Sequence, residues 1–335
     1  WDTREFQWAL EASHHFARAG MRDEAVNAVV SGAESALTRG APHEARRALE
    51  SIRVTYPRDL PPRLHLLLAR ATLLCGEYAA TLDSLAGWEP SSLNGSEQAL
   101  AAQLRAEALH RGRLADDRTI SEAAKVARRL AEEARDEESL VRALQIEAEV
   151  AADLGLVEPL EEIRDAAREA SRASRNSECL ALSRMTQGYC EWVSGDFEAA
   201  AEIFSNTAAL FEELSLHEDY RRVLNGLGMS YTALGRFSEA EHAFQRALVI
   251  AQRLGNPLAV SNVWSNLASL YHDMGRFQDA AHGYRKAINT SGSSTVRFIA
   301  EVYADIARLS IELGNFSEAE RCCTASLAAA ERSGL

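Results

Sequence analysis

Side chains that commonly act in catalysis or metal binding are scattered along this chain of 335 residues rather than grouped. The five cysteines form no C-x-x-C pair, and the only close pair is Cys322 beside Cys323. An odd number at such spacing neither frames disulfides nor binds zinc, and it favours a reducing cytoplasm. His14 and His15 are neighbours, but adjacent side chains on a helix point about 100° apart. They therefore cannot share one metal ion without a further ligand.

Enzymatic sequence signatures are also missing. The chain has no P-loop, no nucleophile elbow and no H-E-x-x-H motif. Gly226-Leu-Gly228 partly matches a dinucleotide-binding loop, but it lies within a predicted helix. The acidic pair Glu132-Glu133 stands beside arginines, which is typical of a solvated helix face. We predict that the protein is not an enzyme and holds no metal ion or cofactor.

Charge and composition argue against nucleic acid and membranes as binding partners. The formal net charge is −13, so the overall field does not attract nucleic acid or anionic lipid. The chain contains no run of 18 uncharged apolar residues, about the minimum length for a helix that crosses a bilayer. We predict no direct nucleic-acid binding and no membrane association. Because the chain starts without methionine and stops just as a helix does, we also expect a fragment of a longer protein.

One short motif recurs at nearly even intervals through the second half of the chain. Its four copies are Gly195-Asp-Phe-Glu-Ala-Ala200, Gly235-Arg-Phe-Ser-Glu-Ala240, Gly275-Arg-Phe-Gln-Asp-Ala280 and Gly314-Asn-Phe-Ser-Glu-Ala319. On both sides of each glycine, apolar residues return every three or four positions, the pattern of an amphipathic helix. Each unit therefore reads as two helices joined at the glycine.

The anchors of the third unit are Trp264-x2-Leu267-Ala268-x2-Tyr271-x8-Ala280-x3-Tyr284-x2-Ala287. This spacing resembles a tetratricopeptide (TPR) repeat. The usual proline after the second helix is absent, and the period of about 40 residues exceeds the roughly 34 residues of the common type. The resemblance implies an all-α fold, a right-handed superhelical solenoid of antiparallel helix pairs.

The repeat signal varies along the chain and suggests three stretches. Residues 176–335 hold four well-anchored repeats, and residues 96–174 read as two degenerate TPR-like helix pairs. Residues 1–89 read as irregular helices continuous with the array, with a break at Pro57, Pro61 and Pro62. We expect loops at residues 89–96 and 290–295.

A binding surface follows from the resemblance, because the first helix of each TPR pair lines the concave side of the array. Spacing by three and four residues along these helices gives eleven candidate groove residues. They are Met185, Tyr189, Trp192, Arg222, Asn225, Met229, Asn262, Ser265, Ser269, His272 and Arg308. Asparagine suits a groove that holds an extended backbone, because its amide both donates and accepts hydrogen bonds. Packing against the preceding repeat or a neighbouring chain, or simple solvation, is the alternative for each of them.

These observations lead to a functional hypothesis. The chain binds a protein or peptide, or a small-molecule inducer, on its concave face. The alternative is a constitutive assembly scaffold that mediates oligomerisation. The stretches Ala12–Val26 and Ala33–Leu49 resemble the start of the helical-repeat region of STAND-type signalling ATPases, including LuxR-type and maltose-regulator-like activators. That resemblance implies the ligand-sensing arm of a larger bacterial, cytoplasmic transcription or signalling regulator.

Overall fold

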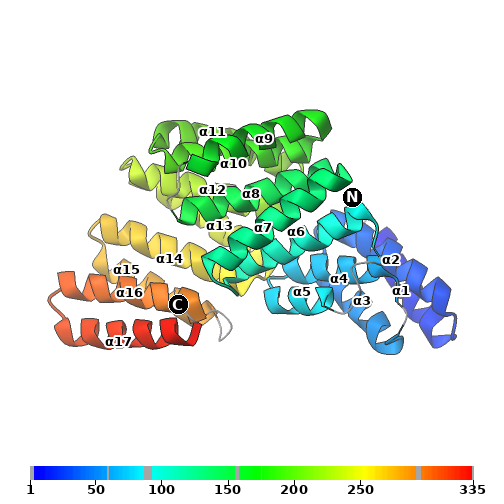
Figure 1. The fold of residues 1–335 in the computed structure, drawn as a ribbon. Helices are drawn as coiled ribbons and strands as arrows, with labels where there is room; N and C mark the ends of the chain where they lie inside the picture. Colours follow the sequence, from blue (N-terminus) through cyan, green and yellow to red (C-terminus); the bar gives the residue numbers. More distant parts are fainter. Residues whose placement is uncertain are drawn as a thin grey trace.

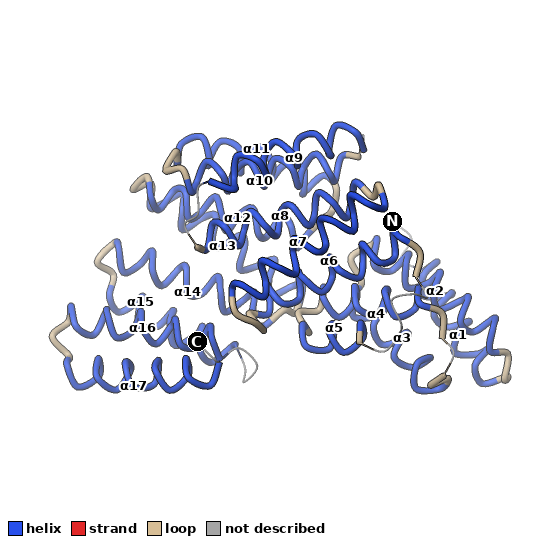
Figure 2. The backbone as a smooth tube through the Cα atoms, in the orientation of Figure 1, coloured by secondary structure: helices blue, strands red, loops and turns tan. Residues whose placement is uncertain are grey.

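The computed structural model describes residues 4–58, 60–86, 93–154, 158–174, 176–291 and 296–333. Within these residues there are 17 helices and no strand (Figure 2). In chain order they are α1 (Arg4–Arg18), α2 (Arg22–Thr38), α3 (Pro42–Thr55), α4 (Pro62–Leu74), α5 (Tyr78–Leu85), α6 (Gly95–Gly112), α7 (Asp117–Ala134), α8 (Glu137–Asp153), α9 (Glu158–Ser174), α10 (Ser177–Val193), α11 (Phe197–Glu213), α12 (His217–Ala233), α13 (Phe237–Leu254), α14 (Pro257–Asp273), α15 (Phe277–Ser291), α16 (Val296–Glu312) and α17 (Phe316–Ser333). Successive helices pack as antiparallel pairs, so the predicted all-α solenoid is confirmed.

The recurring glycines end the first helix of each well-anchored pair. Gly195, Gly235, Gly275 and Gly314 have φ angles of 85, 72, 72 and 71°, a left-handed conformation that glycine adopts without steric cost. The phenylalanine two positions later begins the second helix in every case. The turn therefore fixes the register of each pair.

Small residues let the helices of neighbouring pairs approach closely. A Cβ added at Gly188 of α10 would lie 2.5 Å from the ring of Phe204, and one added at Gly226 of α12 would lie 3.0 Å from the same ring. Phe204 is fully buried. One aromatic side chain of α11 thus fills the space between the first helices of two successive pairs.

The breaks between helices that the sequence predicts lie only partly within the described residues. The break at the prolines is present, because α3 ends at Thr55 and Pro62 is the first residue of α4. Residues 89–92 of the loop expected at 89–96 lie outside the described residues, and Asn94 already caps α6. The second loop was placed too early: α15 continues through Ser291, and residues 292–295 lie outside the described residues.

The array curls until its early helices contact its late ones (Figure 1). Asn256, before α14, donates a hydrogen bond of 3.0 Å to the Tyr78 hydroxyl of α5. Arg297 of α16 forms an ion pair of 2.8 Å with Asp117 of α7. The first helices of the pairs therefore surround a central space. No helix in the described part of the chain has both the length and the apolarity of a membrane span.

Candidate functional site

A cavity of about 490 Å³ occupies the centre of the curl. Its walls come from α5 and from the first helices of successive pairs, α6, α8, α10, α12, α14 and α16. Such a volume is typical of a site for a small ligand or a short chain segment. Early and late helices meet on one wall, where Arg113 at the end of α6 pairs with Glu301 of α16 and its guanidinium lies 6.0 Å from the ring centroid of Phe298.

Eight of the eleven groove candidates line this cavity. They are Tyr189, Trp192, Arg222, Asn225, Met229, Asn262, Ser265 and Ser269. The other three lie elsewhere. Met185 is fully buried among repeat-packing residues, so placing it in the groove was wrong. His272 lies 2.7 Å from Glu312 and packs on Phe277, and Arg308 is an exposed partner of Asp305.

Amide and hydroxyl groups form the middle of the wall. Asn266 donates a hydrogen bond of 2.7 Å to the side-chain oxygen of Asn225, which joins α14 to α12. Asn262 and Ser265, one turn apart on α14, have no side-chain hydrogen bond to any described residue. A half-buried amide and hydroxyl without protein partners are suited to hold the backbone or polar groups of a ligand.

Aromatic and sulfur-containing side chains form another part of the wall, on α10 and α12. Tyr189 packs edge-to-face on Phe204, with ring centroids 5.3 Å apart. The pKa of the Tyr189 hydroxyl is raised, mainly by burial and to a smaller extent by the nearby Glu149 carboxylate, so this group stays neutral. The indole N–H of Trp192 is buried and finds no acceptor among the described residues. This part of the cavity therefore offers an apolar surface, and the unpaired indole N–H of Trp192 is itself inaccessible.

Ion pairs form the floor of the cavity. Arg221 donates to Glu218 at 3.0 and 2.7 Å, while Arg222 donates to Asp219 at 3.1 Å and pairs closely with Glu149. All five residues are buried. Arg222 was predicted as a groove residue and lines the cavity, but its guanidinium is paired with Asp219 and Glu149.

Electrostatics keep this layer charged. Burial by itself raises the pKa of the Glu218 carboxyl, but Arg221 and Arg111 outweigh burial and leave the pKa below its ordinary value. Asp219 behaves in the same way, and its pKa is lowered because Arg142 and Arg222 outweigh its burial. Both carboxylates are therefore ionised at neutral pH, as their arginine partners are.

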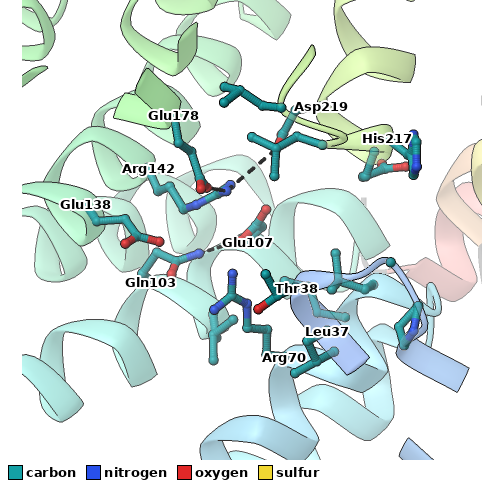
Figure 3. A pocket seen from close by; sticks show the side chains of 18 of the residues that line it. Leu37, Thr38, Arg70, Gln103, Glu107, Glu138, Arg142, Glu178, His217 and Asp219 are labelled. Carbon is teal, nitrogen blue, oxygen red and sulfur yellow. Dashed lines mark hydrogen bonds and ion pairs between the residues drawn. The ribbon is translucent and has the colours of Figure 1, made fainter. Parts of the chain in front are cut away.

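A second cavity of about 420 Å³ lies on the other side of the charged layer. Figure 3 shows Arg142 between Glu178 and Asp219, with Gln103 directed toward Glu107. The two cavities share Arg111 and Glu218 in their walls. The charged layer thus separates the central space into two compartments.

This layer of ion pairs was not predicted from the sequence. Glu218 and Arg221 are three residues apart, and Glu107 and Arg111 are four apart, which is the usual spacing of ion pairs on a solvated helix. The only available signal was position. Glu138, Glu178 and Glu218 are each the second residue of a first helix, α8, α10 and α12. All three glutamates line the second cavity.

Comparisons with known proteins agree with the fold. A family model described as a tetratricopeptide repeat matches residues 178–253 and 219–293. None of the curated protein sequences matches the chain.

Solved structures with the same fold include a Rap protein complexed with competence and sporulation factor. It is 14% identical, with 99% of each chain covered and a TM-score of 0.64. NprR in complex with its cognate peptide NprX is 14% identical, with 91% of this chain and 78% of that chain covered and a TM-score of 0.54. Aspartyl phosphate phosphatase F from Bacillus subtilis is 14% identical, with 98% and 94% covered and a TM-score of 0.53. At these identities the likeness concerns the fold alone.

Proposed function

We propose that the chain is a non-catalytic binding array and that its central cavity holds a segment of a peptide or protein. The observation that carries this proposal is the set of free polar groups in one cavity. Asn262 and Ser265 line it, and neither the amide nor the hydroxyl has a partner among the described residues. A half-buried amide and hydroxyl without protein partners are suited to a ligand's carbonyl and N–H groups.

The comparisons support a peptide as the ligand class. Two proteins with the same fold were solved with a peptide or factor bound, according to their descriptions. The matched repeat region, residues 178–293, contains all eight groove candidates that line the cavity. A small-molecule inducer is the second ligand class that a cavity of about 490 Å³ would accept.

The wider role belongs to the same proposal. We place the chain in the cytoplasm as the sensing arm of a larger bacterial signalling or transcription regulator of the STAND type. Binding would act on such a regulator only if the ligand has a different affinity for two positions of the arm. The ion pairs and the hydrogen bond between early and late helices are the contacts that such a ligand would bias.

A constitutive assembly scaffold is the alternative function. Tyr189 and Trp192, the aromatic residues that a scaffold would bury between copies, line the central cavity. Sedimentation of the chain distinguishes the two functions. A stable oligomer that forms without ligand supports the scaffold, while a monomer that binds peptide supports the sensing array.

Selection from a phage-displayed pool of random peptides tests the binding proposal. A selected peptide should bind the double variant Asn225→Ala, Asn262→Ala at least about ten-fold more weakly than the parent, because its polar groups lose their partners. The matched control is Asn206→Ala with Asn289→Ala, which removes two exposed asparagines from second helices. Peptides whose affinity is unchanged in the first variant would contradict the assignment of the cavity.

A further inference from the structure

The last helix of the array, α17, carries a stripe of side chains whose counterparts on α11, α13 and α15 are buried or half-buried. On α13 the stripe consists of Phe237, Glu241, Phe244 and Leu248. All four are buried or half-buried. On α17 the residues at the same positions are Phe316, Glu320, Cys323 and Leu327. These four are exposed.

The contrast holds at each apolar position. Phe316 is 69% exposed and Leu327 is 66% exposed, while their counterparts on α13, Phe237 and Leu248, are half-buried. At the position of the exposed Cys323, Phe244 of α13 is 2% exposed and Tyr284 of α15 is fully buried. Large apolar side chains exposed as a group mark an interaction surface more often than single exposed ones do. Here the surface continues an interface that already repeats within the molecule.

The polar member of the stripe indicates what would bind. On α13, Glu241 accepts a hydrogen bond of 2.9 Å from the hydroxyl of Tyr271 and pairs at 3.2 Å with Arg276. Both partners belong to the following pair, at the end of α14 and in the turn after it. The Arg276 guanidinium also lies 4.2 Å from the ring centroid of Tyr271, so the three groups form one clasp.

At the end of the array only the glutamate of this clasp is present. Glu320 occupies the position of Glu241, and its exposed carboxylate has no ion pair or hydrogen bond to any described residue. The neighbouring pairs α11 and α15 carry alanine at this position, Ala201 and Ala281. A glutamate in the stripe is therefore a feature of α13 and α17 and not a general requirement of the repeat.

We propose that the exposed face of α17 is a docking surface for an amphipathic helix pair of a partner. The first helix of that pair ends in Tyr-x3-Gly-Arg, as α14 does at Tyr271 and Arg276. Its apolar face covers Phe316 and Leu327, and its tyrosine and arginine engage Glu320. Because Cys323 is smaller than the aromatic ring at this position on α13 and α15, the docked helix also contributes a bulky side chain there.

The chain itself supplies the probe for this surface. Both α13 and α17 have 18 residues and are followed in sequence by glycine, Gly255 and Gly334. A copy of residues 256–291, which carries the Tyr-x3-Gly-Arg sequence, is fused after Gly334 of the full chain. The readout is alkylation of Cys323 by a maleimide, because Cys323 is exposed while the other four cysteines are buried.

Docking should slow alkylation of Cys323 by about ten-fold or more and raise the unfolding temperature by about 3 °C or more. Glu320→Ala should restore several-fold faster alkylation in the extended chain and change nothing in the parent. The control is Glu331→Ala, another exposed glutamate of α17, which should have no effect in either chain. Alkylation as fast in the extended chain as in the parent would overturn the proposal. Concentration-dependent association of the parent with protection of Cys323 would overturn it in favour of a second copy.

Discussion

Asn256 donates a hydrogen bond of 3.0 Å to the hydroxyl of Tyr78, although the two residues are 178 positions apart in the chain. Both side chains are buried. The side-chain oxygen of Asn256 also accepts a hydrogen bond of 3.1 Å from the backbone N–H of Ala259 and so caps α14. One amide therefore starts a helix of the repeat array and holds that helix against the early part of the chain.

This double role gives the first prediction. Tyr78→Phe should lower the free energy of unfolding by about 1–3 kcal/mol, because the buried amide of Asn256 loses its acceptor. Asn256→Ala should cost more, since it also removes the helix cap, worth about 1 kcal/mol. Unfolding in urea measures both changes. If Asn256→Ala is no more harmful than Tyr78→Phe, the cap contributes nothing.

The floor of the cavity gives the second prediction. Arg222→Met leaves the Glu149 carboxylate buried without its closest partner, and we expect a loss of about 3–5 kcal/mol. The double variant Arg222→Met, Glu149→Met removes both charges and should be more stable than Arg222→Met alone. As a control, Arg129→Ala breaks the exposed pair with Glu133, where little change is expected. Urea unfolding that ranks the double variant below the single one would count against charge pairing as the cause.

The third prediction concerns pH. The folded chain lowers the pKa values of Glu218 and Asp219, so the unfolded chain binds more protons as the pH falls. Their contribution to stability should be complete above the ordinary carboxyl pKa of about 4 and should disappear as the pH falls through the lower folded values. The stability gap between the parent and Glu218→Gln, Asp219→Asn should therefore shrink below this pH. Urea unfolding from pH 7 to pH 2.5 measures the gap, and a constant gap contradicts the prediction.

The close packing of α12 against α13 gives the fourth prediction. A Cβ at Gly228 would lie 2.6 Å from the Phe244 ring, so Gly228→Ala forces the ring to move. Overpacking costs about 1–3 kcal/mol, whereas alanine gains about 1 kcal/mol in helix propensity. We expect a net destabilisation by thermal unfolding. Gly95→Ala, where the new Cβ meets Ala134 at an ordinary 3.4 Å, is the control and should be nearly neutral.

The sequence was sufficient to predict the repeat architecture. The even spacing of Gly195, Gly235 and Gly275, with an aromatic residue two positions later, defines where each pair turns. The same periodicity placed Asn225 and Asn262 on helix faces that meet in one cavity. Such local patterns are readable because each pair depends mainly on its neighbours.

The contacts that close the curl could not be predicted in this way. The pairs Tyr78–Asn256 and Arg113–Glu301 join distant segments, and neither residue type is unusual at its position. The buried ion pairs were not predicted, for a related reason. Glu218 and Arg221 look like a surface ion pair in the sequence, and only the curl of the array places them in its interior.

The layer of ion pairs has a consequence for recognition. The two cavities share Arg111 and Glu218, whose charges are already paired within the chain. A ligand that brings its own charge to this wall has to compete with an existing buried ion pair. Recognition there therefore favours an uncharged segment.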